Sequence, residues 1–307
     1  MEDLKSFNLD VSDEVFSLFS ELIYKTSGIK LTFVKKGLLI SRLLRRIKLL
    51  DIKSFHEYYQ RVNNDNEELV EMLNCISTHT TMFFRENYHF EYLKNNVIPE
   101  LRKNKQEKTL RIWSAGCSTG EEPYSIAISV LEALRQSQGM TYKRHTVYNG
   151  LYEGQRGVGC STPARSQDWN IKILATDIST NVLDVAQAGI YEHEQLPYDF
   201  PEKSVGRYFL KGIKENEGKL QVKDFLKETV RFRRLNLKDT DYPFKKEFDA
   251  IFCRNVMIYF DEDMRRHLLS MFYHFLSDGG HIFLGHSETM IGKEKFKPVY
   301  ITVYKKM

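Results

Sequence analysis

Cysteine is scarce in this 307-residue sequence, and the four that occur are not arranged as metal ligands. They lie far apart and form no CxxC pair: Cys75, Cys117, Cys160 and Cys253. That spacing argues against a zinc site and a disulfide framework, and it favours a reducing cytoplasm. The nine histidines show no ligand spacing either. We therefore expect no metal.

Long apolar runs are also absent. No stretch approaches the roughly 20 apolar residues of a membrane-spanning helix. Residues 1–10 have neither the basic start nor the apolar stretch of a secretory signal peptide. The formal net charge of +4 is too small to indicate nucleic-acid binding by itself. We expect a cytoplasmic protein without membrane insertion, long enough for one large and one smaller domain.

Hydrophobic periodicity predicts an all-helical domain over residues 1–80. The apolar stripe of its first helix recurs at helical spacing, at Val15, Leu18, Phe19, Leu22 and Ile23. Further helices are expected at about 34–50, 54–62 and 67–75. Residues 81–108 read as a connector that is mostly helical, with Pro99 near the middle of its helical part.

Strand and helix patterns alternate from Thr109 onward, which predicts an α/β domain over residues 109–307. A doubly wound, mainly parallel sheet with helices on both faces is expected. Strands are predicted at 110–116, 171–177, 248–255, 281–286 and 299–306. Helices are predicted at 122–134, at 179–189 and from Asp261 to Gly279–Gly280.

Two segments interrupt this alternation. Residues 208–222 carry a hairpin signal with ENEG as the turn, which predicts a small antiparallel β-subdomain at about 205–230. Residues from about 135 to 168 are rich in Gly, Ser, Thr and Arg and show no sustained period. A connection of that length is unusual in an α/β unit. We expect a flexible surface insertion there, and a functional lid or docking loop is the alternative.

The loop after the first strand of the α/β domain indicates the ligand. Small residues, Gly116 among them, let the backbone approach a bound molecule closely. Ser118 stands where a dinucleotide fingerprint needs its second glycine, and the loop ends in Glu121 and Glu122 rather than in GK[ST]. Two carboxylates repel phosphate. They suit a ligand with ammonium and sulfonium charges and no phosphate, and S-adenosylmethionine is that ligand.

An acid at the end of the next predicted strand supports this assignment. A carboxylate there, at Asp177, can accept both hydroxyl groups of a ribose. The alternative is a helix N-cap, because a helix is predicted directly after it. The preceding glycine-containing loop favours the ribose role.

Five ordered segments resemble the chemotaxis receptor methyltransferases of bacteria. They are residues 81–86 (TMFFRE), 113–125 (WSAGCSTGEEPYS), 173–179 (ILATDIS), 251–260 (IFCRNVMIYF) and 285–288 (GHSE). The resemblance covers nearly the whole chain. It implies a class I methyltransferase-type sheet with a β-subdomain, after an all-α N-terminal domain. It also implies transfer of a methyl group to glutamate side chains of transmembrane chemoreceptors, by a monomer, giving glutamyl methyl esters.

The resemblance also implies site residues. Cofactor contacts carry over to His79, where the family often has asparagine, and to Thr81, Arg85, Glu121, Asp177, Asn236, Leu237, Arg254 and Asn255. Glutamate has an unperturbed pKa of about 4.3, so its carboxylate needs no general base at neutral pH. Alignment and exclusion of water are the requirements instead. Arg85 and Tyr259 are our candidates for positioning the substrate carboxylate. The alternative for Tyr259 is an aromatic residue of the core.

Six cations in the second predicted helix offer a docking surface for the acidic helices of a receptor: Lys35, Lys36, Arg42, Arg45, Arg46 and Lys48. A merely solvated face is the alternative. The resemblance leaves open whether the hairpin binds a receptor C-terminal peptide by strand pairing. Two other functions remain as alternatives: methylation of RNA or of a small molecule, and a non-catalytic domain that senses S-adenosylmethionine.

Overall fold

The computed structural model describes residues 11–136, 143–148, 152–158, 169–292 and 294–307. Its N-terminal domain contains four helices: α1 (Asp13–Ser27), α2 (Lys36–Leu49), α3 (Phe55–Asn64) and α4 (Asn66–Ile76). The starts of α1, α3 and α4 are fixed by side-chain caps, where Ser12, Ser54 and Asp65 accept backbone N–H groups. No helix in the described part of the chain has the length and apolar composition to cross a membrane.

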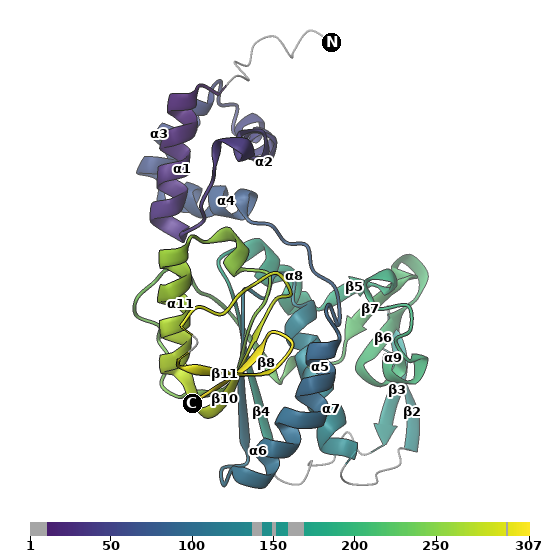
Figure 1. Cartoon of the computed structure of the whole chain (residues 1–307). Coiled ribbons are helices and arrows are strands. Elements are labelled where there is room, and N and C mark those ends of the chain that lie inside the picture. The colour runs from purple at the N-terminus through teal and green to yellow at the C-terminus, as the bar shows by residue number, and fades with distance from the viewer. Residues whose placement is uncertain (1–10, 137–142, 149–151, 159–168, 293) are drawn as a thin grey trace.

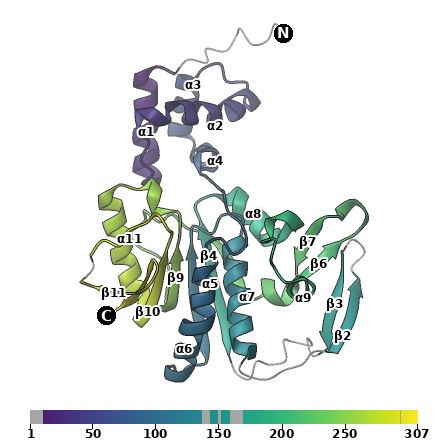
Figure 2. The ribbon, with the colours of Figure 1, turned by 45° about the vertical axis from the view of Figure 1, so that its right-hand side comes forward.

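The four helices enclose one hydrophobic core. Each helix contributes the apolar stripe that its spacing predicts, for example Phe16, Phe19 and Ile23 from α1. Figures 1 and 2 show this domain above one end of the main sheet. The polypeptide then descends beside the sheet through the connector, which contains α5 (Tyr88–Tyr92), a π-helical turn (Leu93–Val97) and α6 (Ile98–Asn104).

The main sheet has the strand order β11-β12-β10-β9-β1-β4-β8. Its parallel strands are β1 (Thr109–Ala115), β4 (Asn170–Asp177), β8 (Val230–Arg234), β9 (Phe248–Cys253) and β10 (Leu276–Leu284). The antiparallel edge is β11 (Phe296–Tyr300) with β12 (Val303–Lys306). Parallel strands point their carboxyl ends to the same side, so the loops after β1, β4, β8 and β9 gather under the N-terminal domain.

Helices cover both faces of this sheet, as predicted. Successive residues of β1 alternate between the faces, so Ile112 joins the core beneath α7 (Glu121–Gln136) while Trp113 joins the core beneath α11 (Glu262–Phe275). Helix α8 (Thr180–Ala188) follows β4. The predicted α/β fold with a preceding all-α domain is confirmed.

A second, antiparallel sheet has the order β2-β3-β6-β7-β5. It includes β5 (Ile190–Glu192) and the predicted hairpin, β6 (Phe209–Gly212) with β7 (Lys219–Val222). Two short helices flank the hairpin, α9 (Glu202–Tyr208) and α10 (Asp224–Lys227). Figure 2 shows this subdomain standing to one side of the main sheet.

The insertion predicted at about 135–168 includes regular structure that the sequence analysis did not predict. Helix α7 continues to Gln136, and the strands β2 (Lys143–Tyr148) and β3 (Tyr152–Val158) form a hairpin that adds to β6. The insertion therefore contains these two strands, and its predicted flexibility stays a prediction. Residues 137–142, 149–151 and 159–168 lie outside the described residues.

Two predicted boundaries near the C-terminus are also wrong. Helix α11 ends at Phe275, and β10 begins at Leu276 with a register shift before His281, so Gly279 and Gly280 belong to a strand. The single strand predicted at 299–306 is a hairpin, because the backbone turns at Thr302, where φ is 49°. Residues 277–280 (SDGG) have low strand propensity, and residues 299–304 (VYITVY) have high strand propensity through the turn, so the local sequence predicted neither boundary. Pairing with the neighbouring strands determines both.

Candidate active site

A cleft lies between the N-terminal domain and the carboxyl ends of the main-sheet strands. Its floor comes from the loops after β1, β4, β8 and β9, and its wall from residues 76–82 and Arg85. The roof is formed by five residues of the N-terminal domain: Ser27, Ile29, Leu31, Lys35 and Leu38. Every site residue predicted from the sequence lines this cleft except Glu121.

The loop after β1 brings its backbone to the cleft surface. Gly116 has φ 84°, and a Cβ at this position would lie 2.4 Å from Cγ2 of Val256. Glycine is therefore required both for the backbone conformation and for the close approach to the loop after β9. The N–H groups of Gly116 and Cys117 both donate to the carbonyl oxygen of Thr176, at 2.8 and 2.9 Å. These bonds fix the loop against the end of β4.

Asp177 lies at the point where β4 ends. One carboxylate oxygen accepts the N–H of Ser118 at 2.9 Å and the other accepts the N–H of Ser179 at 3.0 Å. Each oxygen retains a lone pair for a further donor. Burial raises the pKa of the Asp177 carboxyl, and the two N–H groups act in the opposite direction. The N-cap of α8 is Ser179, so the alternative interpretation of Asp177 as the cap itself is wrong.

The acid that reaches the cleft from α7 is Glu122, not Glu121. Glu121 is 1% exposed, and its carboxylate accepts hydrogen bonds from Gln195 at 2.9 Å and Thr119 at 2.7 Å, away from the cleft. Neighbouring residues of a helix point in different directions, so only one of the pair can face the cleft. Glu121, which the sequence analysis named as a cofactor contact, does not line the cleft, and Glu122 does.

Glu122 belongs to a buried charge cluster around Arg254. The guanidinium of Arg254 lies 3.0 Å from Glu122 and 3.3 Å from Glu86, and it also donates to the carbonyl oxygen of Arg85. Ser114 donates to Glu122 at 2.7 Å. Burial raises the pKa of Glu122 and outweighs its contact with Arg254. For Glu86, burial is outweighed by Arg254 and by neighbouring donors, so the pKa is lowered.

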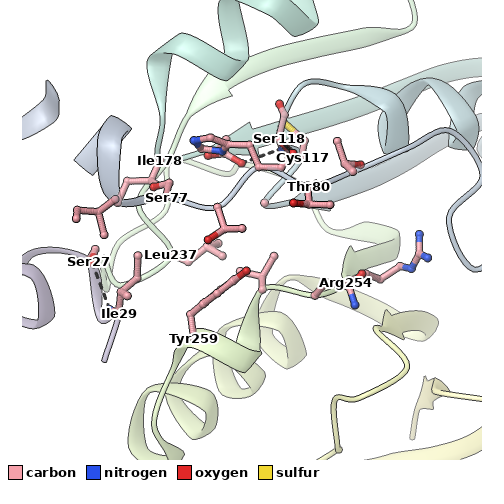
Figure 3. Close-up of a pocket in the computed structure, with 18 of the residues that line it drawn as sticks. Ser27, Ile29, Ser77, Thr80, Cys117, Ser118, Ile178, Leu237, Arg254 and Tyr259 are labelled. Atoms are coloured by element: carbon pink, nitrogen blue, oxygen red, sulfur yellow. Dashed lines mark hydrogen bonds between the residues drawn. The ribbon is translucent and has the colours of Figure 1, made fainter. Parts of the chain in front are cut away.

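Tyr259 and Arg85 occupy the open part of the cleft. Figure 3 shows the Tyr259 ring directed into the space between Leu237 and Arg254. The ring is half-buried, so Tyr259 is not a residue of the core. The ammonium nitrogen of Lys35 lies 5.9 Å from its centroid. Arg85 is likewise partly exposed and donates to the carbonyl oxygen of Thr80 at 2.9 Å.

The remaining predicted contacts surround these groups. His79 and Thr81 line the wall, and the carbonyl oxygen of His79 accepts the hydroxyl of Ser118 at 3.0 Å. Leu237 gives the cleft an apolar surface and is 8% exposed. Asn236 also lines the cleft, but its amide nitrogen donates to the carbonyl oxygen of Thr26 at 2.6 Å.

Direct contacts join the roof of the cleft to its floor. The N–H of Lys30 donates to the carbonyl oxygen of Tyr259 at 3.0 Å, and the Tyr24 hydroxyl donates to Asp261 at 2.8 Å. On the opposite side, Asn74 and Thr180 exchange two hydrogen bonds of 3.1 Å. The N-terminal domain is therefore part of the site. Sequence reasoning missed its roof residues, because no local pattern says which helix end packs over the sheet.

Sequence reasoning also missed the role of Glu288 in the GHSE segment, a residue that does not line the cleft. Its carboxylate accepts four backbone N–H groups at 2.6–3.0 Å, from Gly285, Asn255, Val256 and Met257. Three of these donors belong to the loop of residues 254–259, which carries Arg254 and Tyr259. The GHSE motif was the available signal, because residues 285–288 are among the segments that carry the family resemblance.

The residues present fit S-adenosylmethionine. Asp177 offers acceptors for two hydroxyl groups, Leu237 and Ile178 offer an apolar surface, and Glu122 offers negative charge without a phosphate-binding loop. In the part of the chain that is described, no cluster of three or more His, Cys, Asp or Glu side chains can hold a metal ion.

Family comparison agrees with this geometry. Residues 79–146 and 161–305 match the model of the CheR methyltransferase, SAM binding domain, and residues 14–77 match that of the CheR methyltransferase, all-alpha domain. This chain belongs to the CheR methyltransferase family. The resemblance found in the sequence is confirmed, and so is S-adenosylmethionine as the cofactor. The CheR model passes over residues 147–160, inside the predicted insertion.

Curated members of the CheR family align over most of the chain. The chemotaxis protein methyltransferase of Borreliella burgdorferi is 37% identical over 306 residues, covering 98% of this chain and 97% of the relative. Chemotaxis protein methyltransferase 2 of Pseudomonas aeruginosa is 38% identical, covering 91% and 87%. The Escherichia coli enzyme is 35% identical, covering 94% and 88%. A solved glycopeptide N-methyltransferase aligns with a TM-score of 0.30 at 13% identity, covering 66% and 57%, and that likeness carries no argument.

Proposed function

We propose that this chain is a protein-glutamate O-methyltransferase that methylates chemotaxis receptors and so serves adaptation. The observation that carries the proposal is the convergence of Asp177, Glu122, Arg254 and Tyr259 on one cleft roofed by the N-terminal domain. The names of the curated relatives, which are chemotaxis protein methyltransferases, support it. We further propose that the chain acts as a monomer in the cytoplasm.

Within the cleft, each group has a proposed role in holding the cofactor. Asp177 accepts the ribose hydroxyls, while Leu237 and Asn236 contact the base. Glu122 and Arg254 hold the amino-acid end, with Asn255 beside them. His79, Thr81 and Gly116 complete the surface around the ligand. When bound, the cofactor supplies a methyl group on a cationic sulfur.

The substrate carboxylate needs to be aligned rather than activated. Glutamate is ionised at neutral pH, so no base has to remove a proton before methyl transfer. Tyr259, half-buried with its ring in the cleft, donates its hydroxyl to one carboxylate oxygen. Arg85 attracts the carboxylate from the partly exposed wall. Because transfer joins a negative and a positive group, the roof of the cleft favours the reaction by excluding water.

Receptor docking on α2 involves fewer cations than the sequence suggested. Lys36 pairs with Asp13 at 2.6 Å, and Arg42 donates to main-chain carbonyl oxygens at residues 76 and 77. Arg46 binds both carboxylate oxygens of Glu68, at 2.8 and 2.9 Å. These three cations stabilise the domain itself. The outward cations are Arg45 and Lys48, whereas Lys35 lines the cleft near Tyr259. We propose that Arg45 and Lys48 meet the acidic helices of the receptor.

A receptor C-terminal peptide is the second proposed contact. Strand addition needs an edge strand with unpaired main-chain groups. In the described part of the small sheet the outer strands are β2 and β5, while β6 already pairs with β3 and β7. A tethered receptor tail therefore adds at β2 or β5, and titration with the tail peptide tests this.

The proposed activity is tested by incubating the enzyme with labelled cofactor and receptor-bearing membranes. Label that enters the receptor and leaves as volatile methanol under mild base identifies a methyl ester of a carboxylate. RNA and a membrane preparation without receptors are the matched controls. Label in RNA, or receptor label that resists mild base, contradicts the proposal.

A further inference from the structure

Glu86 belongs to the charge cluster around Arg254 but does not line the cleft. One of its carboxylate oxygens lies 3.3 Å from a guanidinium nitrogen of Arg254. The other accepts hydrogen bonds from the side-chain amide of Asn255 and the N–H of His286, both at 3.3 Å. A carboxylate with donors on both oxygens is stabilised in its ionised form. Glu86 therefore acts on a ligand in the cleft by its charge and through its neighbours, not by contact.

The backbone at Glu86 is held in an unfavourable conformation. Glu86 and Asn255 are both left-handed, with φ 56° and 60°, and their side chains are joined by a hydrogen bond. His286 ties the pair to the loop after β10, and the Nδ1 of His89 lies 3.6 Å from the Glu86 carboxylate. Left-handed residues other than glycine that several segments hold in place are typical of functional sites.

Two carboxylates share one cation in this cluster. Arg254, whose side chain is 2% exposed, lies 3.0 Å from Glu122 and 3.3 Å from Glu86. Among the described residues, no other Lys or Arg lies within ion-pair distance of either carboxylate. His89 is neutral at pH 7, because burial and Arg254 lower its pKa to about 4. The cluster of Glu86, Glu122 and Arg254 therefore carries an excess of one negative charge, at the edge of the cleft that Glu122 lines.

The cofactor before and after methyl transfer differs in charge. S-adenosylmethionine has a sulfonium, an ammonium and a carboxylate group, so it carries one net positive charge at neutral pH. S-adenosylhomocysteine has a neutral thioether in place of the sulfonium and carries no net charge. A negative cluster beside the cleft attracts the first ligand more than the second. With a neutral residue at Glu86, Arg254 and Glu122 would form a balanced pair, and this difference would shrink.

We propose that Glu86 sets the charge of the cofactor site and so raises its affinity for S-adenosylmethionine relative to S-adenosylhomocysteine. Because Glu86 competes with Glu122 for Arg254, the negative charge of Glu122 is only partly neutralised. Glu86 is thus a specificity-determining residue that contacts neither ligand, and it favours the exchange of product for fresh cofactor. This inference rests on the proposed function, in which Glu122 and Arg254 hold the amino-acid end of the cofactor.

Calorimetry with the two ligands tests the inference without any receptor. Glu86→Gln keeps the size of the side chain and removes its charge. We expect its Kd for S-adenosylmethionine to rise by roughly fivefold to tenfold, the order expected for one unit charge acting across a partly solvated site. Its Kd for S-adenosylhomocysteine should change by less than about twofold. Glu91→Gln removes a 48%-exposed carboxylate of α5 and is the matched control, with both Kd values unchanged.

Two further variants separate charge from local geometry. Glu86→Asp keeps the charge on a shorter side chain, so the ratio of the two Kd values should stay close to that of the wild type even if both affinities fall. Glu122→Gln also leaves a single carboxylate beside Arg254. Any contact that it loses to the amino-acid end is common to both ligands and cancels in the ratio, so the preference for S-adenosylmethionine should fall there too.

The inference is overturned if both Kd values of Glu86→Gln rise by the same factor, because a loss of local structure does not distinguish the two ligands. An unchanged ratio in Glu122→Gln overturns it as well, and this variant can be titrated even if Glu86→Gln does not fold. Wild-type protein that binds neither ligand overturns the proposed cofactor site and the inference with it. Because no receptor is present in these titrations, their result is independent of the methyl acceptor.

Discussion

Replacing Glu288 by glutamine changes one oxygen of a buried carboxylate and removes the acceptor on which a catalytic loop depends. One oxygen of Glu288 accepts the N–H groups of Val256 and Met257 at 2.8 and 2.7 Å. The other accepts those of Asn255 and Gly285 at 3.0 and 2.6 Å. A glutamine side chain keeps one acceptor and points an NH2 group at the two donors on the other side.

The expected loss of stability follows from the two N–H groups that would face the NH2 group of the glutamine. Each buried N–H left without a partner costs about 1–3 kcal/mol. Burial raises the pKa of Glu288, so the charged carboxylate is itself destabilised by the interior, and a neutral amide recovers part of the loss. We expect the free energy of unfolding of Glu288→Gln to fall by about 2 kcal/mol. Urea denaturation measures this change.

Activity should fall further than stability alone explains. Glu288 holds Asn255 in a left-handed conformation, φ 60°, between Arg254 and the turn that carries Tyr259. Misplacement of positioning groups by about 1 Å costs on the order of 100-fold in rate. We expect kcat on receptor membranes to fall by at least tenfold while most of the variant remains folded.

The control for this substitution is Glu228→Gln, which makes the same chemical change at an exposed position. Glu288→Asp keeps the charge but shortens the side chain, and we expect an intermediate kcat. A Glu288→Gln enzyme with normal kcat and an unfolding free energy within 0.5 kcal/mol of wild type would refute the role given to this carboxylate.

Four further variants test other parts of the structure. Asp177→Ala should weaken binding of S-adenosylhomocysteine by about 1.5–3 kcal/mol, and calorimetry that finds unchanged affinity removes the ribose assignment. Tyr259→Phe should lower kcat and leave cofactor affinity nearly intact, whereas unchanged turnover excludes the hydroxyl from the site. Arg45→Glu with Lys48→Glu should raise KM for the receptor and leave cofactor affinity unchanged. If the variant and the wild type have the same KM for the receptor, these cations form only a solvated face. Burial and Arg254 lower the pKa of His89 to about 4, so the side chain is neutral at pH 7 in the folded protein. The unfolded chain binds this proton more readily. The free energy of unfolding should therefore fall by about 3 kcal/mol as the pH drops from about 6.5 to 4. His89→Gln should reduce this pH dependence, measured by urea denaturation at several pH values. An equally steep pH dependence in the variant would show that other groups cause it.

The floor of the cleft was predictable because local sequence and sheet topology act together there. Gly116 and Asp177 each end a predicted strand, and parallel strands bring their carboxyl ends to one edge. The same rule places Arg254 and Tyr259 beside them. A correct strand assignment was therefore enough to assemble residues that are far apart in the chain.

The choice between Glu121 and Glu122 was not predictable in the same way. Both acids open α7, and the rotation of that helix decides which one faces the cleft. The rotation depends on partners from other elements: Ser114 of β1 and Arg254 after β9 for Glu122, and Gln195 for Glu121. A sequence pattern does not contain those distances.

The roof of the cleft and the extra hairpin depend on packing between distant segments. The sequence suggested Arg46 as a docking cation. In the structure Arg46 pairs with Glu68, which is buried between α2 and α4. Strand β3 was missed because its glycine-containing sequence lacks alternating hydrophobicity. It pairs with the preceding strand β2 at six positions and with β6, more than 50 residues away, at two.

The hydrogen bonds between roof and floor make ligand binding a property of both domains together. Lys30 is tied to Tyr259, and Asn236 to Thr26, at the positions where the cofactor is proposed to lie. A ligand that contacts both the roof and the floor stabilises the association of the two domains by its binding free energy. Saturation with S-adenosylhomocysteine should therefore merge the melting of the helical domain with that of the sheet domain into one transition. A fragment beginning at residue 81 should keep the strand-end loops yet bind the same ligand more weakly.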